Sequence, residues 1–186
     1  MFVKIELDYG GVNFPLPYKE QGGFYVGFIS VFSGCRRAIE GNPCPGCQNP
    51  SLWNFTDLPM GDTDFLKKYV SGRVERLRHV ASDTQFFYCV IGGEPLDQAV
   101  GDLYSVHDVV MEGIGEDVPT ILYSGYENLA DVDKNVLSYV RNKIMYLKLG
   151  AFLGLPYRKQ GLKSGLATEN QRWIRVAEEL EMELAR

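Results

Sequence analysis

Three of the four cysteines in this chain lie close enough in sequence to act together. Cys35, Cys44 and Cys47 fall within 13 residues, whereas Cys89 stands alone. Thiolates are soft ligands, so three of them can hold a tetrahedral zinc ion with an open fourth position. They can equally hold three irons of a 4Fe-4S cluster and leave the fourth iron free. The spacing therefore predicts a metal centre at this loop.

The turn Cys44-Pro45-Gly46-Cys47 can bring two thiols together over a short distance. Proline restricts its own φ angle, and glycine permits the positive φ that a sharp turn often requires. The alternative is a set of reduced cysteines that bind no metal. A polar loop interrupted by several prolines argues against that alternative, and both zinc and iron-sulfur chemistry stay open at this point.

Composition limits the classes of protein that the chain can belong to. Its 186 residues are 45% hydrophobic and 23% charged, which is typical of one globular domain spanning residues 1–186. A net charge of −5 lacks the basic character of nucleic-acid-binding domains, so we expect no nucleic-acid partner.

The distribution of apolar residues indicates where in the cell the protein is expected. No long apolar stretch and no signal-like N-terminus are present, so we expect no membrane partner and a cytoplasmic location. Cytosolic thiols are normally reduced, which favours metal binding over disulfides.

Apolar patterns predict the elements that position the cysteines. Buried strands are expected at residues 24–32, 84–91, 118–123 and 143–150. Apolar residues at helical spacing predict helices at residues 62–81, 97–111, 131–141 and 169–185. Strands that alternate with helices predict an α/β fold with mostly parallel strands.

Three polar segments follow predicted strands directly. They are the cysteine loop at residues 33–55, the sequence GGEP at 92–95, and Ser124-Gly125. Prolines at 43, 45 and 50 exclude a continuous helix or strand through the loop. Because the carboxyl ends of parallel strands share one edge of a sheet, we expect the three segments to meet there.

Four motifs in this order resemble the activating proteins of anaerobic (class III) ribonucleotide reductase, within the radical S-adenosylmethionine superfamily. They are CPGCQNPSLW at 44–53, GGEP at 92–95, ILYSGY at 121–126 and GLATENQR at 165–172. The resemblance extends from about Phe24 to Trp173. It implies a single radical S-adenosylmethionine domain folded as an incomplete (β/α) barrel of about five or six parallel strands, since a full barrel needs about 250 residues.

One feature departs from the family pattern CxxxCxxC. Eight residues separate Cys35 from Cys44, which is five more than the pattern has, whereas Cys44 and Cys47 match it. Lengthening a flexible loop costs little free energy, so Cys35 is still expected to reach the metal. Cys89 lies about 10 Å before Gly92 along a strand, so we expect it in the core.

The resemblance implies specific chemistry. Cys35, Cys44 and Cys47 would hold a 4Fe-4S cluster whose free iron binds S-adenosylmethionine. Reductive cleavage of this cofactor gives a 5′-deoxyadenosyl radical, which abstracts a glycine hydrogen from the large subunit of anaerobic ribonucleoside-triphosphate reductase. The electron would come from a low-potential donor such as flavodoxin or ferredoxin, in an anaerobic cell.

Cofactor-binding positions follow from the matching motifs. Gly92 and Gly93 would leave room for the methionine moiety, and Glu94 would accept a hydrogen bond from its ammonium group. Asn49 would lie near the adenine, Ser124 near the ribose, and Lys148 near the cofactor carboxylate. Each also has a local interpretation: an ordinary turn, a strand-end serine bonded to nearby backbone, or a solvated lysine.

Two other functions stay open. The same radical chemistry can act on another glycyl-radical enzyme, a peptide or a small molecule. A different class is a zinc-binding interaction module held by the cysteines.

Overall fold

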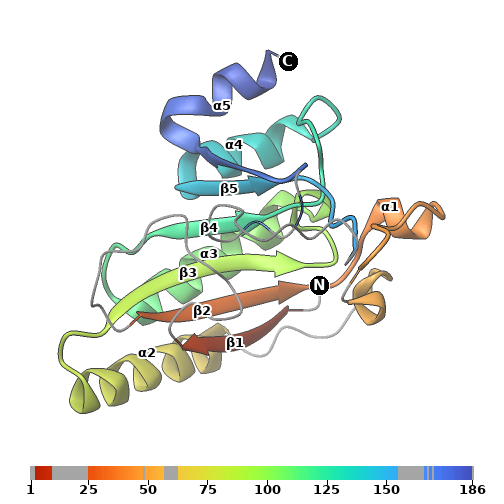
Figure 1. The fold of residues 1–186 in the computed structure, drawn as a ribbon. Helices are drawn as coiled ribbons and strands as arrows, with labels where there is room; N and C mark the ends of the chain where they lie inside the picture. Colours follow the sequence, from red (N-terminus) through yellow and green to blue (C-terminus); the bar gives the residue numbers. More distant parts are fainter. Residues whose placement is uncertain are drawn as a thin grey trace.

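The computed structural model describes residues 3–9, 25–47, 49–56, 63–154, 166, 168 and 170–185. Its centre is a sheet of six strands in sequential order (Figure 1). The strands are β1 (Val3–Tyr9), β2 (Tyr25–Phe32), β3 (Gln85–Gly92), β4 (Thr120–Tyr123), β5 (Tyr146–Leu149) and β6 (Arg172–Arg175). Strands β2 to β5 run parallel, and β1 and β6 pair antiparallel at the two edges. The predicted α/β class with a mostly parallel sheet is confirmed.

Four of the described helices cover one face of the sheet and contribute to one apolar core. Helices α2 (Thr63–Val80), α3 (Val100–Ile114) and α4 (Lys134–Lys143) connect the parallel strands, and α5 (Val176–Leu184) follows β6. Shorter helical segments lie at α1 (Arg36–Ile39) and at the 3₁₀ helices Pro50–Leu52 and Pro95–Asp97. The connections place these short segments at the carboxyl ends of β2 and β3 (Figure 1).

The central strands are buried on both faces, as their apolar sequences predict. On β2, Phe28 and Phe32 point into the core beneath the helices, whereas Ile29 and Val31 point to the opposite face. There they belong to a second, smaller cluster that includes Cys89 of β3. Successive strand residues point to opposite faces, so a continuous apolar run supplies both clusters.

The final helix was predicted too early in the chain. Residues 172–175 form strand β6, which pairs with β5, and helix α5 begins only at Val176. Trp173 and Ile174 fit a helical spacing, but backbone pairing with the edge of β5 takes precedence there. The predicted start at Glu169 lies outside the described residues.

Other predicted elements also need correction. Strand β1 was not predicted, although Val3, Ile5 and Leu7 alternate with polar residues. The described part of the chain contains four mutually parallel strands, where five or six were expected. A one-turn helix, α1, interrupts the predicted loop because residues 36–39 contain neither glycine nor proline.

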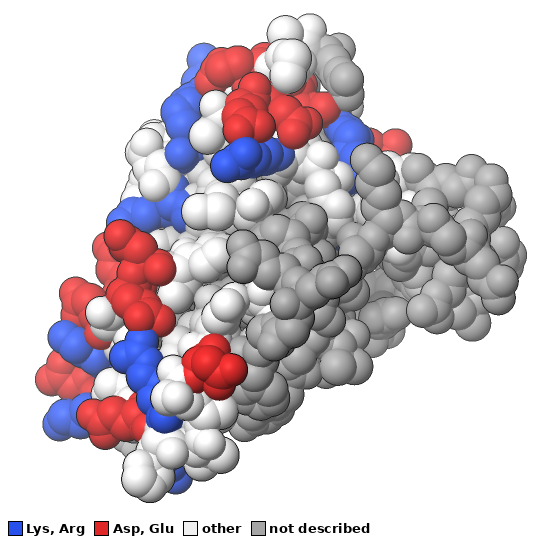
Figure 2. Space-filling view, turned by 60° about the vertical axis from the view of Figure 1, so that its left-hand side comes forward, with Lys and Arg blue, Asp and Glu red and all other residues white. Residues whose placement is uncertain are grey.

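Charges of both signs are mixed over the exposed helices (Figure 2). Ion pairs join α2 to α3 through Lys67 and Glu112, and α4 to α5 through Arg141 and Glu181. Exposed pairs of this kind stabilise a protein by about 1 kcal/mol or less. Among the described helices, none is long and apolar enough to span a membrane.

Candidate metal and cofactor site

The three polar segments meet at one point beside the carboxyl ends of the parallel strands. A methyl group on Gly125 would lie 3.4 Å from Cys44 Sγ and 3.4 Å from Glu94 Oε2. These residues come from the loop after β4, the loop after β2 and the turn after β3 respectively (Figure 1). Parallel pairing therefore brings residues 44, 94 and 125 together, as the sequence predicts.

The three clustered cysteines are free thiols and partly buried. Cys35 is the N-cap residue of α1, and Cys44 and Cys47 bracket a turn in which Cys47 N–H donates to Cys44 O at 3.0 Å. Within the described residues, no three His, Cys, Asp or Glu side chains are arranged to hold a metal ion. The donor types suit a thiolate-bound metal, but the three thiols are not gathered around a common point.

The environment of Cys35 keeps its thiol protonated. Burial raises the pKa of Cys35 to about 11, and the negative charges of Glu94 and Asp97 act in the same direction. A hydrogen bond from the Ala38 backbone opposes this shift. Because metal ligation requires the thiolate, a cation bound here would have to displace the proton from Cys35.

Trp53 makes a contact with a cysteine that was not predicted from the sequence. Its indole Nε1–H donates to Cys47 Sγ at 3.2 Å. Hydrogen bonds to sulfur are among the factors that set the reduction potential of iron-sulfur clusters. The position of a tryptophan six residues after the last cysteine was the available signal.

Glu94 is a buried carboxylate that receives several hydrogen bonds. Leu96 N–H donates to Oε1 at 3.1 Å and Gly125 N–H donates to Oε2 at 2.8 Å. Burial raises the pKa of Glu94 to about 7, while these N–H groups and the Ser124 hydroxyl oppose the shift. Each carboxylate oxygen can accept more than one bond, so capacity remains for an ammonium group.

Gly92 and Gly93 are packed against the protein backbone on the side where a Cβ would stand. A Cβ on Gly92, whose φ is +142°, would lie 2.0 Å from Phe32 O. A Cβ on Gly93 would lie 2.4 Å from Gly34 O and 2.5 Å from Leu52 O. These glycines therefore let the turn after β3 approach the start of the cysteine loop.

Lys148 lies on β5 beside Tyr123 of β4. Its Nζ is 4.8 Å from the centre of the Tyr123 ring, a cation–π contact. Burial lowers the pKa of Lys148 to about 8, and the nearby Cys44, Cys89 and Glu94 side chains oppose that shift. The half-buried lysine therefore supplies a positive charge on the side of the site where cysteine and carboxylate side chains lie.

Ser124 and Asn49 have mainly local contacts. Ser124 is 5% exposed, and its Oγ accepts a hydrogen bond from Tyr126 N–H at 3.0 Å. Asn49 is exposed, and its backbone carbonyl accepts from Leu52 N–H at 3.0 Å. The structure thus brings Ser124 into the site beside Glu94, whereas no described contact brings the Asn49 side chain there.

Cys89 lies in the core of the sheet, and residues of the late GLATENQR motif hold the chain after β5. Cys89 is fully buried, as expected for a core cysteine. Asn170 Nδ2 donates to Ala151 O at 2.9 Å, and Gln171 Nε2 donates to Gly150 O at 3.2 Å. The motif therefore fixes the chain as it leaves β5. Gly165, Ala167 and Glu169 lie outside the described residues.

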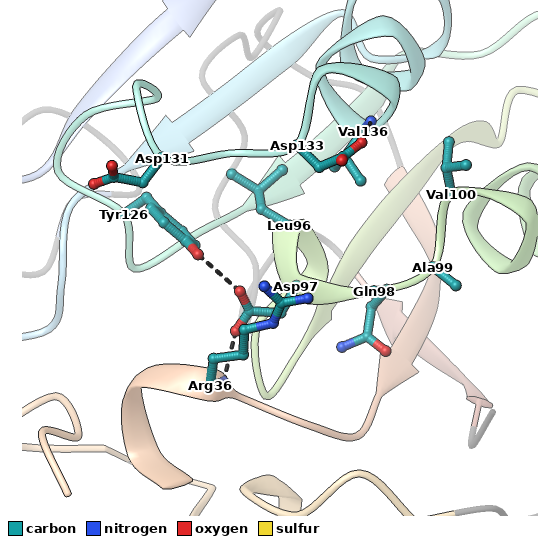
Figure 3. A pocket seen from close by; sticks show the side chains of 10 residues that line it. All are labelled: Arg36, Leu96, Asp97, Gln98, Ala99, Val100, Tyr126, Asp131, Asp133 and Val136. Atoms are coloured by element: carbon teal, nitrogen blue, oxygen red, sulfur yellow. Dashed lines mark hydrogen bonds between the residues drawn. The ribbon is translucent and has the colours of Figure 1, made fainter. Parts of the chain in front are cut away.

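A pocket of about 440 Å³ lies next to the cysteine loop (Figure 3). Asp97 stands in its wall between Arg36 and Tyr126, and dashed lines in Figure 3 mark its bonds to both. Asp97 and Tyr126 were not among the site residues predicted from the sequence. Their positions, three residues after Glu94 and two residues after Ser124, gave no pattern that points to chemistry.

No protein-family model matches the chain, and no curated protein or solved structure matches it. The resemblance to reductase-activating proteins therefore rests on the four sequence motifs.

Proposed function

We propose that this protein is a glycyl-radical activating enzyme of the radical S-adenosylmethionine type. It would bind a 4Fe-4S cluster through Cys35, Cys44 and Cys47 and would act on the large subunit of anaerobic ribonucleotide reductase. The observation that carries the proposal is the meeting of Cys44 Sγ and the Glu94 carboxylate beside Gly125. A cysteine loop and a cofactor-binding turn must be neighbours for this chemistry, because cofactor and cluster react in contact.

The layer arrangement also supports the proposal. All four longer helices pack on one face of the sheet, and the opposite face carries its own apolar cluster. In a (β/α) barrel the helices lie outside and the strands enclose the other face, whereas a doubly wound sheet has helices on both faces. A partial barrel is therefore the finer fold that we propose.

The side chains present suit the two groups in their chemistry. When bound, the reduced cluster supplies the electron that cleaves S-adenosylmethionine. The three thiols would bind iron, and the buried Glu94 carboxylate would attract the methionine ammonium. Lys148 would attract the carboxylate of the cofactor. Glu94 is buried and Lys148 is half-buried, and removal from water strengthens charge interactions. The other residues around the site must exclude water and unwanted hydrogen-atom donors.

Anaerobic reconstitution with iron and sulfide tests this proposal. We expect a brown protein with four irons per chain that produces 5′-deoxyadenosine under a strong reductant. Cys35→Ala, Cys44→Ala and Cys47→Ala should each abolish cluster incorporation. Cys89→Ala, which removes a buried thiol away from the loop, is the matched control and should retain the cluster.

Two results would contradict this assignment. One is a colourless protein that binds one zinc ion through the cysteines and never cleaves S-adenosylmethionine, which is the behaviour of a zinc module. The other is full cluster content in Cys44→Ala or Cys47→Ala. Electron paramagnetic resonance of an added anaerobic reductase then tests the substrate, since a glycyl radical should appear on it.

A further inference from the structure

The backbone around Cys35 is held on both sides by the segment that follows β3. Before the cysteine, Gly34 O accepts a hydrogen bond from Glu94 N–H at 2.8 Å. After it, Arg36 N–H donates to Asp97 Oδ2 at 2.7 Å. The position of Cys35 therefore depends directly on residues 50 or more positions later in the chain.

Asp97 links this attachment to a second loop. It is only 8% exposed, and its Oδ1 accepts a hydrogen bond from the Tyr126 hydroxyl at 2.8 Å (Figure 3). Its own N–H donates to Glu94 O at 3.1 Å, which fixes the aspartate backbone. Hydrogen bonds to an ionised acceptor are stronger than neutral ones, so both donors are held firmly.

Cys44 and Cys47 are held by other contacts. A methyl group on Gly46, between them, would lie 2.6 Å from the Cα of Gly154, so this turn packs tightly against the chain after β5. The Trp53 indole donates to Cys47 Sγ. Cys35 N–H in turn donates to Trp53 O at 2.9 Å, so Trp53 contacts both ends of the cysteine loop. Among the described contacts, Asp97 is attached only at the Cys35 end.

The long spacing makes these attachments important. Eight residues lie between Cys35 and Cys44, and a loop of that length restricts the distance between its ends only weakly. The hydrogen bonds from Cys35 N–H to Trp53 O and from Arg36 N–H to Asp97 Oδ2 then position the Cys35 backbone relative to the other two cysteines. Of these two acceptors, only the Asp97 carboxylate belongs to a side chain.

We propose that Asp97 is the positioning residue for Cys35. Through Arg36 N–H and the Tyr126 hydroxyl it fixes the backbone beside Cys35, from which the first thiol of the lengthened loop would close onto a metal together with Cys44 and Cys47. The inference rests on the proposed function only in taking Cys35 as a metal ligand. Outer partners that orient ligands typically change metal affinity by about 10- to 100-fold when removed.

Anaerobic titration of the metal-free protein with cobalt(II) tests the role of Asp97. Thiolate-to-cobalt absorption reports the number of bound thiolates, so the wild type should show three. Asp97→Ala should bind cobalt about 10- to 100-fold more weakly, with absorption reduced to that of two thiolates. Alkylation mapped by mass spectrometry should become faster at Cys35 and stay unchanged at Cys44 and Cys47.

Two further variants separate positioning from general damage. Asp97→Asn should restore cobalt binding, because its amide oxygen can accept from Arg36 N–H and its NH₂ can donate to the Tyr126 oxygen. Asp133→Ala is the matched control. Asp133 lines the same pocket and accepts from Asn135 N–H at 2.8 Å at the start of α4. Its loss should leave cobalt affinity and Cys35 alkylation as in the wild type.

Three results would overturn the inference. These are unchanged cobalt binding in Asp97→Ala, an equal effect of Asp133→Ala, and a wild-type cobalt complex that lacks the Cys35 thiolate. A protein that binds cobalt through three thiolates and responds to Asp97→Ala, but never cleaves S-adenosylmethionine, supports the inference. That same result contradicts the proposed function.

Discussion

Glu94 shows how one side chain serves both the fold and the proposed chemistry. Its carboxylate joins the turn after β3 to Gly125 after β4, and it lies beside the Cys44 thiol. The buried position raises its pKa to about 7, so near neutral pH a neighbouring cation would strongly favour the ionised form. A cofactor ammonium would provide that cation.

Replacing Glu94 by Gln should weaken cofactor binding while the cluster is retained. The variant loses a charge-assisted hydrogen bond, which typically contributes about 1.5–3 kcal/mol, so affinity should fall roughly 10- to 100-fold. Anaerobic binding of S-adenosylmethionine, iron content and deoxyadenosine production can be measured on one preparation. Glu116→Gln, at an exposed carboxylate paired with Arg78, should behave like the wild type. Equal binding by Glu94→Gln would mean that GGEP is only a turn.

At the level of elements, the turn after β3 depends on glycine for packing. From the sequence, Gly92 and Gly93 were expected to leave space for the methionine moiety. In the structure, the carbonyl oxygens of Gly34 and Leu52 occupy the place of a Gly93 side chain. The lack of side chains at Gly92 and Gly93 therefore allows the end of β3 to lie close to the start of the cysteine loop.

Gly93→Ala should destabilise the protein because the new Cβ would lie 2.4 Å from Gly34 O. Overpacking of this kind typically costs about 1–3 kcal/mol, to be measured by urea unfolding. Gly72→Ala is the matched control, since nothing lies within 4 Å of its Cβ position in helix α2. It should instead stabilise by about 0.5–1 kcal/mol, because alanine favours helix. Equal stability of the two variants would contradict this account of the turn.

For the molecule as a whole, the burial of His107 makes the free energy of unfolding depend on pH. It is 4% exposed, and its Nδ1 lies 3.2 Å from the Tyr139 hydroxyl. The Tyr88 ring packs edge-on against the imidazole at 5.2 Å. Burial lowers the pKa of His107 to about 4, the charge of Lys143 adds to the shift, and Asp108 opposes it.

This lowered pKa predicts acid sensitivity. Below pH 6.5 the unfolded chain binds a proton at residue 107 that the folded chain does not, so stability falls between about pH 6.5 and pH 4. The loss from this group should reach about 2 kcal/mol at pH 5 relative to pH 8. Urea unfolding of His107→Phe should show a flatter pH dependence. His79→Gln, at an exposed position on α2, should keep the wild-type dependence.

The sequence alone determined the parallel core of the sheet and the edge at which the candidate site lies. Continuous apolar runs such as residues 25–32 and 85–91 form buried strands in most contexts, and their ends carry cysteine, glycine and glutamate. Because parallel strands end at the same edge of the sheet, the order of the strands and loops in the chain predicted that Cys44, Glu94 and Gly125 lie close together. These features depend on short-range patterns and on topology.

Tertiary structure decided what those patterns leave open. Residues 172–175 became a strand because the edge of β5 offered unpaired backbone groups, and α1 formed where Asp97 holds Arg36 N–H. The raised pKa of Glu94 and the crowding at Gly93 arise from groups distant in sequence. Burial, hydrogen bonding and contact between distant segments exist only once the chain has folded, so composition and spacing carry no information about them.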